Sequence, residues 1–243
     1  MMKIMQKTPE KISFETDMDI NLANAIRRSV NEISVLAIDT VDIYRNDSAL
    51  YDEFVAHRIG LIPIKHEKLI EPNKCSCKGE GCSKCTIELK LNVEGREVLS
   101  RDLGEEVIYK DMPIVLLEGE QGLELVAKAR LGKGRSHAKF TPGLVFYRES
   151  VKINISKEGE KNKELAEIFP DFFEFADKLK SKNEWLCDLD QTDVENLRGV
   201  EIKPTGNLIF NIESWGQVKP EEIFLESIRA LEKNLSELSS SLD

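Results

Sequence analysis

The sequence predicts an α+β fold, and three observations support this. Short segments in which every second residue is apolar recur along the chain, as is typical of half-buried strands. Two segments near the chain ends instead carry apolar residues at helical spacing. The strands and helices do not alternate regularly, so a doubly wound parallel sheet is not expected. At 243 residues the chain is long enough for one large domain or two small ones.

The net charge disfavours a protein that wraps nucleic acid by itself. Lysine and arginine total 34 and aspartate and glutamate 44, which gives a net charge of −10. Affinity for nucleic acid depends largely on cations that neutralise phosphates, so we expect no direct DNA binding. No run of about 18 apolar residues is present, and the first ten residues lack the apolar core of a secretory signal. We therefore expect a cytoplasmic protein with no membrane association.

The N-terminal third is expected to contain strands at residues 11–16 and 37–44 and helices at 22–33 and 52–60. Gly60 is expected to end the second helix. One face of the first helix is formed by Leu22, Ala25, Ile26, Ser29, Val30 and Ile33, and Arg27 and Arg28 lie on its other side.

Residues 71–86 are rich in glycine and cysteine and are expected to form a loop. A helix is expected at residues 164–180, around a break at Pro170. Apolar alternation predicts further strands at residues 87–93, 123–131, 144–147, 151–155 and 208–212.

The last predicted helix has the clearest periodicity. Pro220 suits the first turn, and Glu221 and Glu222 suit the positive end of the helix dipole. The apolar residues are spaced 4, 3, 4, 3 and 4 apart, which is a heptad seam. Such a helix either packs on its own sheet or pairs with a helix of another chain. The seam consists of Phe224, Ile228, Leu231, Leu235, Leu238 and Leu242.

Four of the five cysteines lie close together as C-x-C-x4-C-x2-C, formed by Cys75, Cys77, Cys82 and Cys85. Four thiolates at this spacing can surround one tetrahedral zinc ion. The spacing differs from the ferredoxin run, so we favour zinc over an iron–sulfur cluster, and a reducing cytosol disfavours disulfides. Cys187 stands alone and is interpreted as a small core residue.

No catalytic motif is recognisable. The sequence lacks a G-x4-G-K-[ST] phosphate loop, an H-E-x-x-H zinc motif and a G-x-S-x-G elbow. His57 is interpreted as a structural histidine. The basic stretch at residues 128–139 is either a solvated face or a patch that docks on an acidic partner surface.

Four stretches occur in the order found in one known family. They are Asn21-Leu-Ala-Asn-Ala-Ile-Arg-Arg28, Ala56-His-Arg-Ile-Gly-Leu-Ile-Pro-Ile64, Ser136-His-Ala-Lys-Phe140 followed by Pro142-Gly143, and Glu213-Ser-Trp-Gly216. Together they resemble the family of archaeal RNA polymerase subunits of the D type, which also contains their eukaryotic third-subunit counterpart and the N-terminal domain of the bacterial α subunit. The resemblance covers most of the chain.

The resemblance implies an alpha-subunit-like dimerisation domain built from residues 1–46 and 150–243, with a mainly-β insert domain at 47–149 that carries the cysteine loop. The implied partner is the small polymerase subunit L, and the pair would form the platform for subunits N, P and B. Catalysis, the nucleotidyl transfer of a DNA-directed RNA polymerase, would belong to the whole complex.

In one region the sequence departs from some family members, which carry an iron–sulfur excursion before the last strand. Here the corresponding stretch, about 164–199, is reduced and retains only Cys187, so we expect no cluster there. Its expected core residues are Leu165, Ile168, Phe169, Phe172, Phe173, Phe175 and Leu179.

The main hypothesis from the sequence is a non-catalytic assembly subunit. The alternative, a zinc-binding module that binds nucleic acid, is disfavoured by the charge of −10. The expected interface with subunit L consists of Leu22, Ala25, Ile26, Arg27, Arg28, Val30, Ile33, Phe224, Ile228, Leu231, Leu235 and Leu238.

Overall fold

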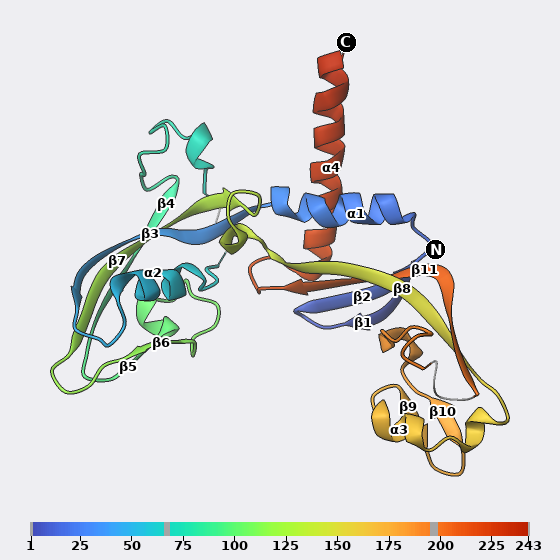
Figure 1. The fold of residues 1–243 in the computed structure, drawn as a ribbon. Helices are drawn as coiled ribbons and strands as arrows, with labels where there is room; N and C mark the ends of the chain where they lie inside the picture. Colours follow the sequence, from blue (N-terminus) through green and yellow to red (C-terminus); the bar gives the residue numbers. More distant parts are fainter. Residues whose placement is uncertain (1, 66–68, 195–198, 243) are drawn as a thin grey trace. The chain divides into compact units, whose positions relative to one another are not determined.

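The protein has two compact units, each assembled from segments that are distant in the sequence. The structure is a computed structural model that describes residues 2–65, 69–194 and 199–242. One unit joins Met1–Asn24 to Val145–Ile212, and the other joins Ala25–Leu144 to Glu213–Asp243. Helices occur with several antiparallel strand pairs, which confirms the predicted α+β class (Figure 1).

The first unit is organised around a sheet that combines two N-terminal strands with two strands from the second half of the chain. Its strand order is β1 (Lys3–Lys7), β2 (Lys11–Thr16), β11 (Val200–Ser214) and β8 (Gly143–Ile155). The predicted strand at residues 11–16 is β2, and its apolar residues Ile12 and Phe14 are buried.

Side chains that are almost 200 residues apart in the sequence meet between β2 and β11. The rings of Phe14 and Phe210 stack with centroids 5.5 Å apart. Beside them Ser13 Oγ donates a hydrogen bond of 2.7 Å to Asn211 Oδ1, and both side chains are buried. A buried hydroxyl that lacked this acceptor would be costly, so the pair favours this register of the two strands.

The segment between β8 and β11 forms a small lobe of mixed structure. The helix predicted at residues 164–180 is wrong beyond α3 (Glu164–Ile168), because β9 (Phe173–Phe175) and β10 (Leu179–Ser181) form an antiparallel pair. Pro170 disfavours helical backbone at the residue before it, and Phe169 has φ −122° and ψ 64°. Residues 195–198 of this predicted excursion lie outside the described residues.

The lobe has a hydrophobic core of its own, in which most of the expected residues lie. Ile168 is the exception, since it is exposed. The core consists of Ile153, Leu165, Phe173, Leu179, Cys187, Val194, Val200 and Ile202, with Phe169, Phe172 and Phe175 packed against it.

Arg148 connects β8 to this lobe. Its guanidinium donates hydrogen bonds to the carbonyl oxygens of Trp185 and Cys187. Partial burial lowers the pKa of Arg148, although Asp188 opposes that shift. The half-buried cation therefore satisfies two carbonyl groups that the short strands of the lobe do not pair.

The second unit contains a three-stranded sheet with the order β3 (Ser34–Asn46), β7 (Gly122–Lys133) and β4 (Thr86–Glu94). Strand β7 is antiparallel to both neighbours. Helix α2 (Asp52–Gly60), which matches the predicted bounds, buries Val55 and Ile59 in the hydrophobic core of this unit. Figure 1 shows α2 beside this sheet.

Two helical segments lie near the chain ends, as predicted. Helix α1 (Ile20–Ser29) continues into a 3₁₀ turn, η1 (Val30–Glu32). Helix α4 (Pro220–Leu242) begins at the predicted proline and packs near η1. None of the described helices combines the length and the hydrophobicity that a transmembrane span requires.

Three further short strands have no counterpart in the predicted pattern, namely β1, β5 (Glu97–Leu99) and β6 (Pro113–Leu116). Each has five residues or fewer, so alternation has little length in which to appear. The strands predicted at 144–147 and 151–155 are parts of the single strand β8, and residues 208–212 fall within β11.

The lobe core yields the first testable prediction. Phe173 is 1% exposed, and its replacement by alanine removes a large buried ring. We expect Phe173→Ala to destabilise the lobe by about 3–5 kcal/mol. Hydrogen exchange would then accelerate at residues 164–194 but not in the β3–β7–β4 sheet. Ile168→Ala, at a side chain that is 50% exposed, is the matched control and should change little. Equal acceleration in both variants would contradict this assignment of the core.

Candidate functional site

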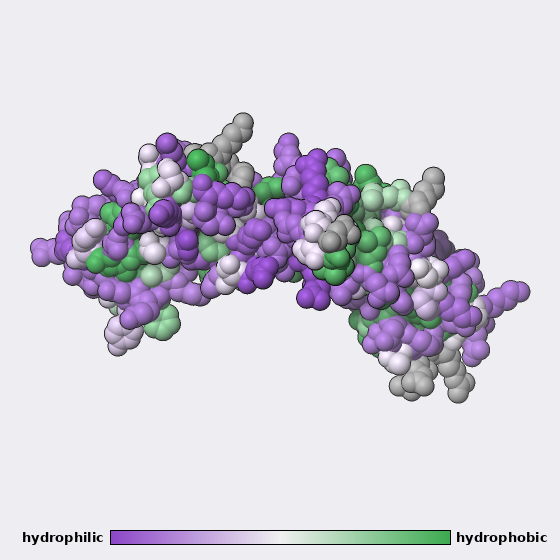
Figure 2. All heavy atoms as spheres, turned by 90° about the horizontal axis from the view of Figure 1, so that it is seen from above, coloured by the Kyte–Doolittle hydropathy of each residue, from purple (hydrophilic) through white to green (hydrophobic). Residues whose placement is uncertain are grey.

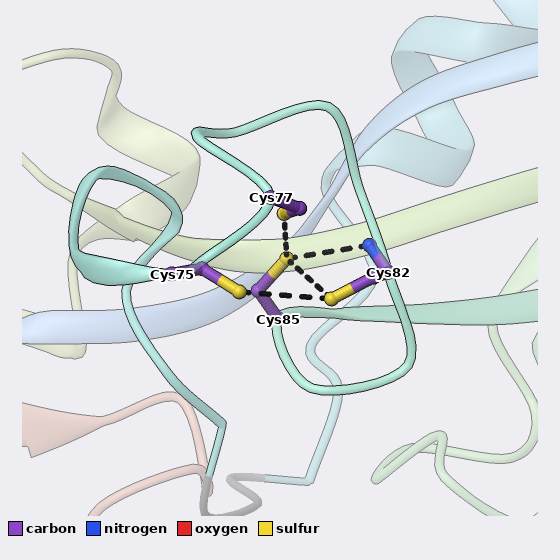
Figure 3. A group of neighbouring side chains, drawn as sticks. All are labelled: Cys75, Cys77, Cys82 and Cys85. Atoms are coloured by element: carbon purple, nitrogen blue, oxygen red, sulfur yellow. Dashed lines mark hydrogen bonds between the residues drawn. The ribbon is translucent and has the colours of Figure 1, made fainter.

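The four clustered cysteines come together in the loop between α2 and β4. A short 3₁₀ turn, η2 (Pro72–Lys74), leads into the loop, and the last cysteine directly precedes β4. Figure 3 shows the four sulfur atoms turned toward one another. All four lie within 4.8 Å of each other, which makes the loop a possible metal site. The cysteines are Cys75, Cys77, Cys82 and Cys85.

The spacing of the sulfur atoms fits a single tetrahedral ion. The Sγ–Sγ distances are 3.6 Å for Cys75 and Cys82, 3.5 Å for Cys77 and Cys85, and 3.9 Å for Cys82 and Cys85. Metal–sulfur bonds of about 2.3 Å in a tetrahedron place sulfurs roughly 3.8 Å apart. None of the five cysteines forms a disulfide. These three distances lie within about 0.3 Å of that value, so the cluster is a possible site for one metal ion.

The backbone of the loop turns sharply where the sequence has glycine. Gly79 has φ 90° and Gly81 has φ 92°, values that favour glycine. The amide of Glu80 donates to the carbonyl oxygen of Cys77 at 3.1 Å, and the amide of Cys85 donates to that of Cys82 at 2.9 Å. These turns bring the two halves of the cysteine pattern face to face.

The close approach of the thiols gives Cys77 and Cys75 different pKa values. The pKa of Cys77 falls to about 6 because its sulfur accepts hydrogen bonds from the thiols of Cys85 and Cys75 and from the Gly79 amide. The Cys77 amide favours the thiolate of Cys75, but desolvation and hydrogen bonds to the other thiols outweigh it and raise the pKa of Cys75 to about 11. Several thiolates cannot share this small volume unless a cation balances their charge.

Glu71 attaches the loop to the sheet, a role that the sequence does not indicate. Its carboxylate forms an ion pair of 2.7 Å with Lys74 and accepts a hydrogen bond of 2.6 Å from Ser34 Oγ at the start of β3. Lys74 and Ser34 hold the pKa of Glu71 below its usual value despite partial burial. A single glutamate in a polar loop does not indicate this contact, because its partner Ser34 lies 37 residues away in the sequence. Cys187 lies in the lobe core and outside the cluster.

Helix α4 divides its apolar residues between two faces. The buried positions of the helix are Pro220, Ile223 and Ser227. The heptad seam is on another face, where Phe224, Ile228 and Leu231 are half-buried. Leu235 is 57% and Leu238 is 58% exposed, and Leu242 is also exposed.

The residues expected at the interface in the N-terminal helix differ in exposure. Ile26, Val30 and Ile33 are buried, which makes them part of the chain's own core. Leu22 and Arg28 are exposed, while Ala25 and Arg27 are intermediate.

The basic stretch at residues 128–139 is largely paired with acidic residues of its own unit. Arg130 and Lys139 both contact Asp39, at 2.6 Å and 3.0 Å. Burial raises the pKa of Asp39, but hydrogen bonds from these two cations outweigh that effect and hold the pKa below its usual range. Further pairs are Lys128 with Asp42, and Lys133 and Arg135 with Glu32.

The turn before α4 contains a second feature that the sequence does not indicate. Gln217 Nε2 donates hydrogen bonds to the carbonyl oxygens of Leu36 at 2.6 Å and Ile64 at 3.0 Å. Gly216 has φ 88°, and a Cβ there would lie 2.9 Å from Ile108. The turn is therefore fixed against the segment that follows α2. The motif around Trp215 is recognisable in the sequence, but the role of Gln217 depends on a contact across 153 residues.

Exposed apolar residues are local rather than continuous. Figure 2 shows hydrophilic residues over most of the visible face, with hydrophobic residues in separate patches. The sequence has no phosphate-binding loop or nucleophile elbow to accompany these features. The features that stand out in the described part of the chain are the four-cysteine cluster, the exposed stripe of α4 and the anchored turn before it.

Comparison with known proteins identifies counterparts along nearly the whole chain. The family model "RNA polymerase Rpb3/RpoA insert domain" matches residues 36–143. The chain is 33% identical to DNA-directed RNA polymerase subunit Rpo3 of Archaeoglobus fulgidus, over 91% of this chain and 89% of that protein. It is 34% identical to Rpo3 of Thermococcus kodakarensis, over 94% and 92% of the two chains. A eukaryotic relative, RNA polymerase II subunit rpb3 of Dictyostelium discoideum, is 27% identical over 93% and 89%.

The different acidities in the cluster give a prediction for the metal-free chain. The thiolate is the nucleophile, so the rate of alkylation by iodoacetamide rises with pH through the pKa of the thiol. We expect Cys77 to react first, with a half-maximal rate near pH 6, and Cys75 to react only in alkaline solution. Cys187 lies outside the cluster and burial raises its pKa, so it is the internal control for a thiol without thiol neighbours. Peptide mapping by mass spectrometry would show the order, and alkylation of Cys75 before Cys77 would contradict it.

Proposed function

The chain belongs to the family of DNA-directed RNA polymerase subunits that includes archaeal Rpo3 and eukaryotic Rpb3, and we propose that it acts there by pairing with the small subunit L. It is a non-catalytic subunit of the polymerase, and nucleotidyl transfer belongs to the complex. Its own contribution is assembly, and the half-buried and exposed seam of α4 is the observation that supports this best.

The pairing surface comprises the seam and the exposed part of α1. Leucines that are more than half exposed at heptad spacing are unusual on a free helix and suit a partner helix. Burial of apolar surface contributes about 25 cal/mol per Å², so several hundred Å² per partner supply many kcal/mol before association costs. Ile26 and Val30 belong to the core beneath, while Leu22, Ala25, Arg27 and Arg28 are the α1 residues accessible to a partner.

We infer that the four-cysteine centre holds one zinc ion with a structural role. Zinc suits four thiolates in a tetrahedron, and all four positions are taken by protein sulfur, which is typical of structural rather than catalytic sites. Lys74, Lys78 and Lys84 offset part of the negative charge of such a centre. The ion would hold together a loop that has few apolar residues of its own.

We also propose the domain arrangement that the family resemblance implies. Residues 1–46 and 150–243 would form the dimerisation domain, with the lobe at about 164–199 as a reduced excursion, and residues 47–149 the insert. The match of the insert-domain model to residues 36–143 supports an insert in this region. Subunits N, P and B are the further partners that this arrangement would receive.

The proposed role of the seam in pairing is tested by placing a charge at exposed positions, because a charge there should not disturb the folding of the free chain. Leu235→Asp and Leu238→Asp place a carboxylate in the apolar contact with subunit L. We expect each to weaken pairing at least a hundredfold, or about 2.7 kcal/mol, measured by co-expression with subunit L and titration of the purified chains.

Ser236→Asp on the same helix is the matched control, because Ser236 lies outside the heptad seam and is exposed. It should pair as the native chain does. Normal yield of the heterodimer from Leu235→Asp would refute the seam, whereas loss of pairing in all three variants would point to a general effect of charge on the helix.

The zinc assignment is tested by the metal content and the visible absorption of the purified chain. The native chain is expected to hold one zinc ion and to lack visible absorption. Cys85→Ser, at a nearly fully buried ligand, should abolish zinc binding, while Cys187→Ser should keep it. Inductively coupled plasma mass spectrometry measures the content. Iron accompanied by visible absorption in the native protein would overturn the assignment.

A further inference from the structure

We infer that Glu232 sets the register of the partner helix on α4 by pairing with a lysine or arginine of subunit L. The inference rests on the proposed pairing through the heptad seam, and it adds the charge that the partner must carry. Residues that flank a heptad seam influence which partner binds and in which alignment, because their side chains reach the facing helix. On α4 the two flanks of the seam differ in exposure and in charge.

One flank of the seam faces the chain's own unit. It consists of the residues directly before Ile228, Leu235 and Leu242, which are Ser227, Asn234 and Ser241. Ser227 is buried, and its hydroxyl donates a hydrogen bond of 2.7 Å to the carbonyl oxygen of Phe224. Asn234 lines a cavity of about 360 Å³ together with Glu32 and Arg135. The side chains of this flank are uncharged, so they offer a partner no charge to recognise.

The other flank is open to solvent and contains a single charge. It consists of the residues directly after Phe224, Leu231 and Leu238, which are Leu225, Glu232 and Ser239. All three are exposed, and Leu225 is 51% exposed. Neighbouring members of this flank are one heptad apart, or about 10 Å along the helix axis. A partner that covers the seam therefore meets an apolar residue, a carboxylate and a hydroxyl along this edge, in that order.

The carboxylate of Glu232 is open to a partner because α4 uses its own cations elsewhere. The cations of the helix are Arg229 and Lys233. Arg229 pairs with Glu226 at 2.5 Å, and Lys233 pairs with Glu237 at 3.7 Å. Glu232 itself forms no ion pair within the part of the chain that the structure describes. A carboxylate beside an apolar contact loses hydration when a partner covers it, so a cation on the partner is needed to compensate.

The seam alone does not fix the register of a partner helix. Beyond Phe224 it consists of isoleucine and leucine, so a shift of the partner by one heptad would bury apolar surface of the same kind. In the shifted alignment the partner's cation would lie opposite Leu225 or Ser239, and Glu232 would be covered without a counter-charge. The apolar seam thus contributes affinity, whereas Glu232 selects one alignment.

The test uses the full chain and purified subunit L, titrated against each other at low and high salt. An exposed ion pair contributes modestly to affinity and is screened by salt. We expect Glu232→Gln to weaken pairing about two- to fivefold at low salt and to reduce the salt dependence of pairing. Glu232→Lys replaces attraction by repulsion, so it should weaken pairing about tenfold or more.

Glu237→Lys is the matched control. It makes the same charge reversal on the same helix, but Glu237 lines the cavity on the side of the chain's own unit. This variant should pair as the native chain does. The partner cation is then identified with variants of subunit L in which one lysine or arginine at a time is replaced by glutamate. We expect one of these variants to restore pairing with the Glu232→Lys chain.

Unchanged pairing of Glu232→Lys would overturn the inference, as would failure of every subunit L variant to restore it. Equal weakening by Glu237→Lys would also overturn it, because that result would show a general effect of charge on the helix. Failure of the proposed function is distinguishable, since the native chain would then not pair with subunit L or Leu235→Asp would pair normally. Pairing that Leu235→Asp weakens and Glu232→Lys does not would refute the register role alone.

Discussion

One constraint governs the second unit: helix α4 carries apolar residues that the chain itself does not bury. Helix α4 attaches to its own unit through Pro220, Ile223 and Ser227, whose narrow face leaves the heptad residues half-buried or exposed. Exposure of Leu235 and Leu238 to water is unfavourable unless another surface covers them. The helix is therefore complete as secondary structure, while Leu235 and Leu238 are not covered by the described part of the chain.

The cysteine loop has few buried side chains. Between Pro72 and β4 the chain buries few side chains apart from Cys75 and Cys85, so hydrophobic packing cannot order this segment. The segment is ordered instead by four converging sulfur atoms and by the hydrogen bond between Glu71 and Ser34. Hydrogen bonds from neighbouring thiols lower the pKa of Cys77, whereas, despite the Cys77 amide, desolvation and hydrogen bonds to the other thiols raise that of Cys75. A bound metal ion would thus stabilise a loop whose hydrogen bonds already bring the sulfur atoms together.

Local patterns in the sequence predicted local structure well. Helix α2 and strand β2 have the expected bounds, and the cysteine spacing located the four-sulfur cluster. The helix expected after Ile168 failed because Pro170 interrupts it and the chain forms a hairpin instead, and helical periodicity over so short a segment is ambiguous. Features that depend on distant partners left no signal. Gln217 and Glu71 are ordinary polar residues until the fold brings carbonyl and hydroxyl groups to them.

The turn at residues 214–219 leads directly into helix α4 and is fixed by several hydrogen bonds. Ser214 Oγ donates to the carbonyl oxygen of Val218 and accepts from the Gly216 amide at 2.9 Å, so the turn is braced internally. One of its residues, Gln217, anchors it to the segment after α2. Helix α4 starts directly after it. Because the turn is braced internally and anchored through Gln217, the same contacts fix the start of α4 against the segment that follows α2.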